Sequence, residues 1–310
     1  MSREIAPIFV LGKHRSGTTG LSNHLCEHPA IAGVQYKQHF DWGYHESGYF
    51  TYVVGRYGPL SYWPNYREFV EVMCASDYFR LMEIEKEYML SLWPTTYAGF
   101  FESIMEEYAY RQNSGYWLEK SPSHTKKALW LAEEYPEARF VAIIRDVTDV
   151  IASSLFHHDE GDVAEPEGVE RFAAIIRVVL GWVHYNKSIY AVRRRYPSRT
   201  IVVRYKDFQE KKVSTLKSIC DFLKVNFEKN ICSLTYSRNS SFSNGKTREK
   251  AITETEKSYS RQLAEVLSKA PYKGYRLMYF LYEQYRGQPD LPDWFFRLSD
   301  QKVEIRKGKY

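Results

Sequence analysis

A glycine loop between an apolar run and a helical pattern is the feature that most constrains the fold of this chain. Ile8 to Leu11 form a short apolar run bounded by polar or turn residues, which is typical of a buried strand. Gly12 and Gly17 follow with four residues between them, and Leu21 and Leu25 then begin a helical pattern. Strand, glycine loop and helix in this order allow backbone N–H groups to approach a phosphate closely. The sequence therefore predicts an anion site at the start of an α/β fold.

The loop resembles a Walker A loop but lacks the residue on which nucleoside triphosphatases depend. Thr18 stands where a lysine should follow the second glycine, and Thr19 occupies the Ser/Thr position. That lysine binds the β- and γ-phosphates, so its absence argues against a kinase or an ATPase. The positive charges lie inside the loop instead, at Lys13 and Arg15.

Further apolar runs along the chain predict that strands and helices continue to alternate after the glycine loop. Three more short runs predict buried strands: Tyr116 to Leu118, Phe140 to Ile144 and Ile201 to Val203. Helical spacing appears at residues 129–135 and again from residue 172 to Pro197. The alternation predicts a mostly parallel central sheet flanked by helices, with ligands at the carboxyl ends of the strands. We expect residues 1–310 to form one domain.

Two segments fit the alternation poorly. Residues from about 44 to 113 hold little strand signal and many aromatic residues, and we interpret them as a helical insertion that binds the acceptor. Aromatic residues make up 16% of the chain, and we assign most of them to a bulky core. Residues 157–168 are acidic, contain proline and glycine and lack periodicity, which predicts a surface loop or lid.

The net charge and the cysteine content limit the kinds of ligand that we expect the chain to bind. The formal net charge of +5 at pH 7 is mild and not gathered into one tract, which favours an anionic ligand over nucleic acid. The four cysteines contain no CxxC pair, so we expect neither a disulfide framework nor a zinc site. The first apolar run is too short for a signal peptide or a membrane span, so we expect a cytoplasmic protein. The oligomeric state is not indicated by the sequence.

The glycine loop also carries the first part of a family resemblance. Residues 13–19 read KHRSGTT and resemble the first motif of the sulfotransferases that use 3′-phosphoadenosine-5′-phosphosulfate (PAPS), which is Pro-Lys/Arg-Ser-Gly-Thr-Thr. The match holds from Arg15 onward, and the proline is lacking. Downstream, residues 118–122 (LEKSP) resemble the Glu-Lys-Thr-Pro segment of the same family.

Two further motifs follow in the family's order. Residues 140–146 (FVAIIRD), with Ser153 behind them, resemble the second motif, in which a strand ends in Arg and a Ser follows. Residues 202–208 (VVRYKDF) and 219–223 (ICDFL) resemble the family's Tyr-Glu-Asp-Leu strand end and its next helix. The likeness spans roughly residues 5–230 and is closest in motif style to bacterial, tyrosylprotein and heparan-type members.

The resemblance implies how PAPS would be bound. Arg145 and Ser153 would hold the ribose 3′-phosphate, because a guanidinium can grip a phosphate by two hydrogen bonds and a nearby serine can add a third. An ion pair with a neighbouring aspartate is the alternative for Arg145. Tyr205 would contact the adenine, and residues 240–250 could close over the 3′-phosphate. The loop would bind the 5′ end of PAPS through Arg15, Ser16, Gly17, Thr18 and Thr19.

The reaction implied is an in-line attack in which charge accumulates on the leaving 5′-phosphate. Arg15 and the loop would stabilise that charge, and Lys120 would approach the bridging oxygen, so no metal is expected. A base should take the proton of the acceptor. In heparan-type members the base is a Glu shortly before a His-Phe-Phe-Asp-like segment.

That glutamate is absent from this chain. Residues 38–42 read QHFDW and resemble the segment, but Tyr36 and Lys37 stand where the Glu would fall. We choose His39 as the base, since histidine titrates near neutral pH. The alternatives are Asp41, Glu46 and His124.

The sequence thus predicts an enzyme that moves a sulfuryl group from PAPS to a hydroxyl of a carbohydrate or small-molecule alcohol, releasing 3′-phosphoadenosine-5′-phosphate. Two other classes stay open. One is a P-loop kinase-like phosphotransferase. The other is a non-catalytic carbohydrate-binding protein on a degenerate nucleotide fold, suggested by the missing Glu and the many aromatics. The acceptor itself is undetermined, because an aromatic insertion suits a sugar, a phenol or a lipid alcohol equally well.

Overall fold

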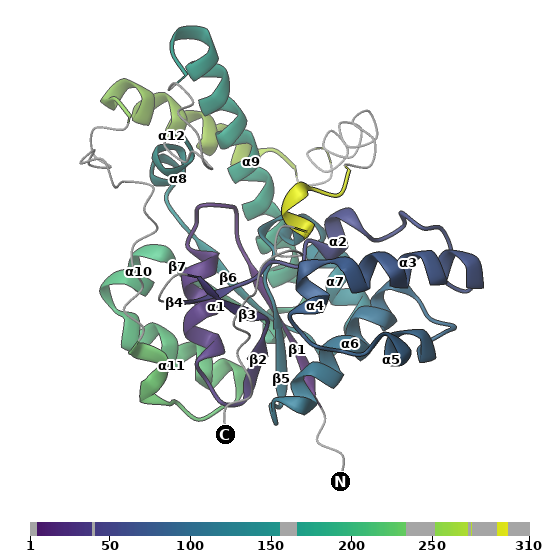
Figure 1. Cartoon of the computed structure of the whole chain (residues 1–310). Helices are drawn as coiled ribbons and strands as arrows, with labels where there is room; N and C mark the ends of the chain where they lie inside the picture. The colour runs from purple at the N-terminus through teal and green to yellow at the C-terminus, as the bar shows by residue number, and fades with distance from the viewer. Residues whose placement is uncertain are drawn as a thin grey trace.

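A computed structural model describes residues 5–38, 41–155, 166–233, 252–271, 274 and 290–296 of the chain (Figure 1). Its centre is a five-stranded sheet in the order β2-β5-β1-β6-β7, in which every neighbouring pair runs parallel. The strands are β1 (Ala6–Leu11), β2 (Ile31–Gly33), β5 (Tyr116–Glu119), β6 (Arg139–Ile144) and β7 (Thr200–Arg204). The predicted parallel sheet is therefore confirmed, with all four predicted strands present.

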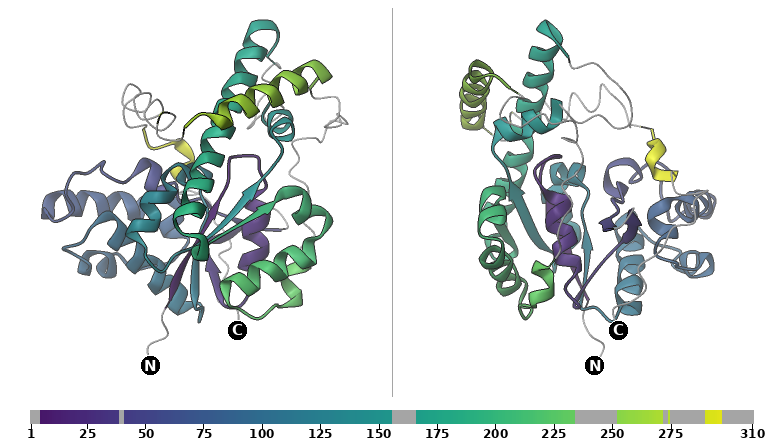
Figure 2. Two further views of the ribbon diagram at one scale, coloured as in Figure 1. Left: turned by 180° about the vertical axis from the view of Figure 1, so that it is seen from behind. Right: turned by 60° about the vertical axis from the view of Figure 1, so that its left-hand side comes forward.

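Helices cover both faces of the sheet (Figure 2). Side chains alternate along a strand, so Ile8 and Val10 of β1 enter one core while Phe9 and Leu11 enter the other. The first core is covered by α1 (Thr18–Cys26), α10 (Tyr205–Glu210) and α11 (Lys212–Leu223). The second is covered by α7 (Ala128–Glu134) and by the insertion.

The insertion at residues 44–113 is mainly helical, as predicted. It contains α2 (Tyr49–Tyr52), α3 (Trp63–Ala75), α4 (Asp77–Arg80), α5 (Lys86–Ser91) and α6 (Tyr97–Arg111). Most of its rings are buried, and Tyr49, Phe50 and Phe101 contact one another with centroids 4.7 to 5.2 Å apart. These aromatics form a core, which leaves few of them to contact a ligand.

The long predicted helix is α9 (Gly168–Arg195), which extends beyond the carboxyl-terminal edge of the sheet (Figures 1 and 2). Its outer half packs on α8 (Val147–Leu155) and α12 (Glu254–Lys269). Arg171 of α9 binds Glu256 of α12 through Nε at 2.6 Å and Nη2 at 3.2 Å. Of the predicted loop at 157–168, residues 157–165 lie outside the described part of the chain.

The sequence analysis missed β2 and a hairpin formed by β3 (Gln35–Gln38) and β4 (Asp41–Tyr44). β2 has only three residues, and the hairpin strands read QYKQ and DWGY, without an apolar run. The described residues also form short 3₁₀ helices, which are η1 (Pro122–Lys127), η2 (Pro197–Arg199), η3 (Lys229–Cys232) and η5 (Asp293–Phe296). In the parts of the chain described, no helix is both long and apolar enough to cross a membrane.

Candidate functional site

The glycine loop turns sharply between β1 and α1. Arg15 has a φ of 70° and Gly17 a φ of 92°, both in the left-handed region. A Cβ on Gly17 would lie 2.5 Å from the ring of Tyr205, so the position has no room for a side chain. α1 begins at Thr18, and the first N–H groups of a helix have no partner within it. These groups and the helix dipole make the loop suited to an anion.

Three residues predicted to bind phosphate come together beside the loop. Arg15 donates from Nε to Ser153 Oγ at 3.0 Å, and Arg145 donates from Nη1 to the Arg15 carbonyl oxygen at 2.9 Å. Arg145 directly follows β6, while Ser153 lies on α8. From the sequence, Arg15 is predicted to bind the 5′ end of PAPS, and Arg145 with Ser153 the 3′-phosphate. The structure places all three residues in contact, and we call them the arginine cluster.

Arg145 is held on several sides and is 5% exposed. Its guanidinium lies 4.4 Å from the ring centroid of Tyr205, and Trp182 Nε1 donates to its carbonyl oxygen at 2.8 Å. Asp149 approaches its Nε only at 3.5 Å, a long contact for an ion pair. Tyr205, predicted to contact adenine, thus packs between Gly17 and Arg145.

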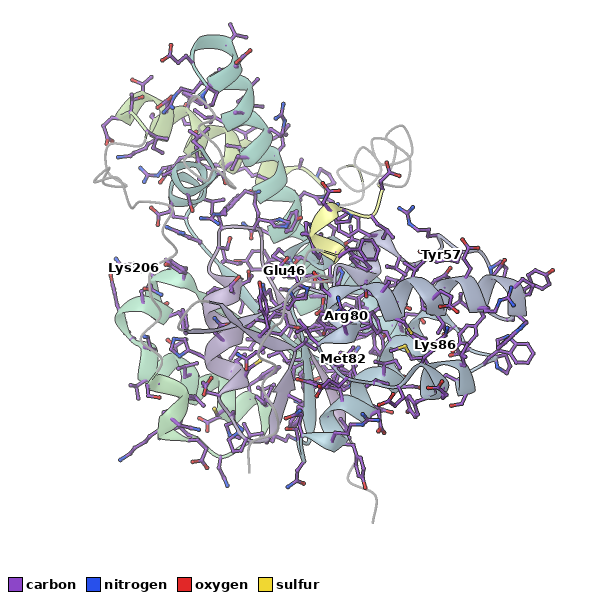
Figure 3. The ribbon with its side chains drawn as sticks, viewed as in Figure 1. Glu46, Tyr57, Arg80, Met82, Lys86 and Lys206 are labelled. Carbon is purple, nitrogen blue, oxygen red and sulfur yellow. The ribbon has the colours of Figure 1, made fainter. Side chains whose placement is uncertain are left out.

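A second cluster centres on Lys120, which follows β5 and is 1% exposed. Its Nζ donates to Thr19 Oγ1 at 3.1 Å and to Glu46 Oε1 at 2.5 Å. The Glu46 side chain keeps 34% of its surface exposed, so its carboxylate is open to solvent as well. Figure 3 shows Glu46 near the end of the sheet from which α9 rises. We call Lys120, Glu46 and Thr19 the lysine cluster.

The candidate bases are placed differently from one another. His39 and the side chain of Asp41 lie outside the described part of the chain. Glu46 belongs to the lysine cluster. His124 is buried, accepts from the Phe50 N–H at 3.1 Å through Nε2, and has Nδ1 2.8 Å from Glu119 Oε1. Both ring nitrogens of His124 therefore face protein groups in the core.

Glu119 was missed as a functional residue, although it stands in the LEKSP motif. It is fully buried and accepts from Tyr44 Oη at 3.0 Å and from Ser47 Oγ at 2.8 Å. Burial by itself would raise the pKa of this carboxyl, but the contacts with His124 and with nearby serines outweigh burial and lower the pKa. The charged carboxylate thus anchors residues 44–47 and with them Glu46.

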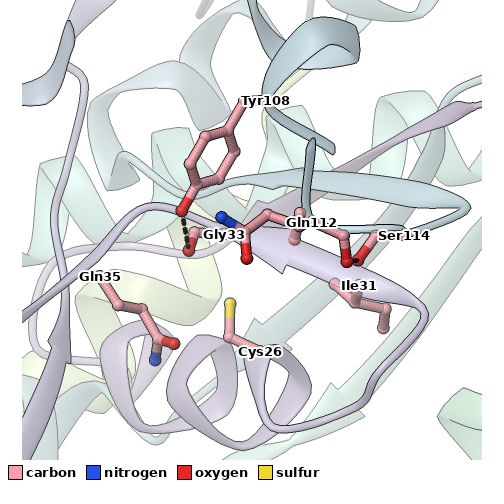
Figure 4. Close-up of a pocket in the computed structure, with 8 residues that line it drawn as sticks. Cys26, Ile31, Gly33, Gln35, Tyr108, Gln112 and Ser114 are labelled. Carbon is pink, nitrogen blue, oxygen red and sulfur yellow. Dashed lines mark hydrogen bonds between the residues drawn. The ribbon is translucent and has the colours of Figure 1, made fainter. Parts of the chain in front are cut away.

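Among the described residues, we also considered a cavity and possible metal ligands. A small cavity behind β2, lined by Cys26, Gly33 and Tyr108 among others, lies at the opposite end of α1 from the glycine loop (Figure 4). Within the described ranges, no group of three His, Cys, Asp or Glu residues is placed to hold a metal. The predicted closing segment at 240–250 is not described.

Comparison with known proteins shows the family to which the chain belongs. The model of a family described as "Sulfotransferase family" matches residues 7–229, which include both clusters. No curated protein matches the chain. Among solved structures, the sulfotransferase domain of the Synechococcus PCC 7002 olefin synthase is similar, with 18% identity, a TM-score of 0.51, and coverage of 94% of this chain and 97% of that one. The mouse sulfotransferase SULT7A1 complexed with PAP shows 13% identity, a TM-score of 0.45, and coverage of 91% and 90%.

Proposed function

Because the chain belongs to the sulfotransferase family, we propose that it moves a sulfuryl group from PAPS to a hydroxyl of a carbohydrate or small-molecule alcohol. The observation that carries this proposal is that the glycine loop lies between the arginine cluster and the lysine cluster. A triphosphate would need a lysine and a metal at the loop, whereas Thr18 stands at the lysine position.

PAPS carries two separate anionic ends, and the site offers a place for each. The loop and the start of α1 suit the 5′-phosphosulfate. The arginine cluster suits the 3′-phosphate, since it combines the guanidinium groups of Arg145 and Arg15 with the hydroxyl group of Ser153. The ring of Tyr205 lies beside Arg145 of the arginine cluster, where it would contact the adenosine.

The lysine cluster suits the chemical step. As the acceptor oxygen forms its bond to sulfur, the bond between sulfur and the bridging oxygen of the 5′-phosphate breaks. Lys120 would stabilise the charge that this oxygen gains, because its ammonium lies beside Thr19 at the start of α1. Glu46 would take the proton that the acceptor hydroxyl loses. Of the two candidate bases that the structure describes, His124 is buried in the core, which supports Glu46, while His39 and Asp41 stay predictions from sequence.

We also propose that the insertion contributes the acceptor surface, since Glu46 stands near its first residue. We further propose that residues 1–310 act as one domain, with a cytoplasmic location as the sequence predicts.

Transfer of labelled sulfate from PAPS to acceptors of the sugar, phenol and lipid-alcohol classes tests this function. Product formation without added metal is expected. Binding of PAPS should raise the melting temperature, and ATP with Mg²⁺ should not. Equal shifts by the two nucleotides, or Mg²⁺-dependent turnover of ATP, would contradict the proposal and favour a kinase. Sugar binding without transfer would favour a non-catalytic protein.

A further inference from the structure

Lys13 is a cation at the glycine loop that the proposed reaction does not use. Its side chain is partly buried and lies along α9, where Nζ is 5.7 Å from the ring centroid of Tyr185. Gly181 lies against this side chain, since a Cβ there would be 3.3 Å from Lys13 Cε, a tight contact, and 3.5 Å from Nζ. Glycine weakens a helix interior, so its presence in α9 gives the lysine room at a cost to the helix.

Among the described residues, no carboxylate lies within ion-pair distance of the Lys13 ammonium group. Within the residues that the structure describes, Nζ makes no hydrogen bond and no ion pair. Burial lowers the pKa of Lys13 to about 8. A partly buried ammonium group that contacts an aromatic ring still has N–H donors to satisfy, and charged groups of this kind gather at sites that receive a ligand.

Lys13 follows Gly12, whose N–H donates to Thr125 Oγ1 at 2.9 Å, so this part of the loop lies beside η1. The neighbouring His14 is exposed, its ring is 6.1 Å from that of Tyr185, and its electrostatic neighbours include Glu46 and Lys120. Lys13 therefore borders the region that the acceptor would occupy.

Among the described residues named here, positive charges outnumber negative ones. Glu46 and Lys120 form an ion pair and largely offset each other. Lys13 then contributes a further positive charge. An acceptor with an oxyanion near its reacting hydroxyl would compensate this excess.

We propose that Lys13 binds an anionic group of the acceptor, so that the preferred acceptor carries a carboxylate or a phosphate near the hydroxyl that receives the sulfuryl group. The inference rests on the proposed function and specifies its substrate class. Lys13 is a specificity residue in this scheme and takes no part in bond making.

The test uses hydroxyl acceptors in matched sets on a sugar, a phenol and an aliphatic alcohol. Each set contains a carboxylate, its primary amide and a phosphate monoester, so that the two anion types are compared with a neutral partner. The enzymes are the wild-type chain, Lys13→Met, Lys13→Arg and, as a control for the loss of one charge, Lys217→Met on the exposed face of α11. PAPS affinity and melting temperature are measured for each.

The wild-type chain and the Lys217→Met variant should prefer an anionic member by about tenfold in kcat/KM. Lys13→Met should lose this preference through a higher KM, with neutral acceptors and PAPS affinity unchanged, and Lys13→Arg should keep most of it. No preference in the wild-type chain, or equal losses for charged and neutral acceptors, would overturn the inference. Weaker PAPS binding by Lys13→Met would make Lys13 a cofactor residue and also overturn it. If no acceptor is sulfated, the proposed function fails together with this inference, whereas turnover of neutral acceptors alone contradicts only the role of Lys13.

Discussion

Arg15 donates a hydrogen bond from Nε to the hydroxyl of Ser153 at 3.0 Å, across 138 residues of sequence. The contact joins the glycine loop to α8, and Arg145 extends it by donating to the carbonyl oxygen of Arg15. A phosphate bound here would meet two guanidinium groups whose positions are already defined. Variants in and around the arginine cluster and the lysine cluster therefore test the site.

Arg145→Ala should weaken PAPS binding by about 1.5 to 3 kcal/mol, because a hydrogen bond to a charged group is lost. Titration calorimetry with PAPS measures the effect. Asp149→Asn is the matched control, since Asp149 is 52% exposed and only 3.5 Å from Arg145 Nε, and it should change the affinity little. An unchanged affinity of Arg145→Ala would mean that the 3′-phosphate binds elsewhere.

Gly17→Ala should destabilise the fold and abolish PAPS binding, because the new methyl group would overlap the Tyr205 ring. Gly55→Ala separates strain from overlap, since Gly55 also has a positive φ, of 86°, but no atom within 4 Å of its Cβ position. In urea unfolding, we expect Gly55→Ala to lower the free energy of unfolding by about 1 to 2 kcal/mol and Gly17→Ala to lower it by more. Equal losses would show that backbone strain alone is responsible.

Glu46→Gln should lower kcat by at least about 100-fold, the lower range for general-base catalysis, and leave PAPS affinity nearly intact. Single-turnover transfer assays at saturating PAPS measure this. His39→Ala provides the comparison, because the sequence favours His39 and the geometry favours Glu46. A large loss of kcat in His39→Ala with little loss in Glu46→Gln would assign the base to His39.

Glu119→Gln should lower the free energy of unfolding by about 3 kcal/mol at pH 7, because a buried hydrogen-bonded carboxylate loses its charge. The pKa of Glu119 is lowered in the folded chain from 4.5, so its contribution is present above pH 4.5 and is lost as the pH falls through the folded value. Urea unfolding between pH 7 and pH 4 should therefore show a smaller loss of stability in the variant. Parallel profiles of the two proteins would exclude a charged Glu119.

The central strands and the glycine loop were predictable because their signals are local. Ile8 to Leu11 are apolar in one unbroken run, and Gly12 and Gly17 mark the turn that follows. The hairpin at residues 35–44 was not predictable, since its strands are polar and are held by pairing with each other and by Tyr44, whose hydroxyl reaches Leu118 and Glu119.

The sequence by itself determined the four longer strands of the central sheet, the anion-binding loop and the types of charged residue around it. Only the tertiary structure decided which charges meet. The strand order β5-β1-β6 places Lys120 and Arg145 on opposite sides of the loop, so that one contacts Thr19 and Glu46 while the other contacts Arg15. Spacing along the chain reports on neighbours within a helix or a strand, whereas contacts between distant residues depend on how strands pair and how helices pack across them.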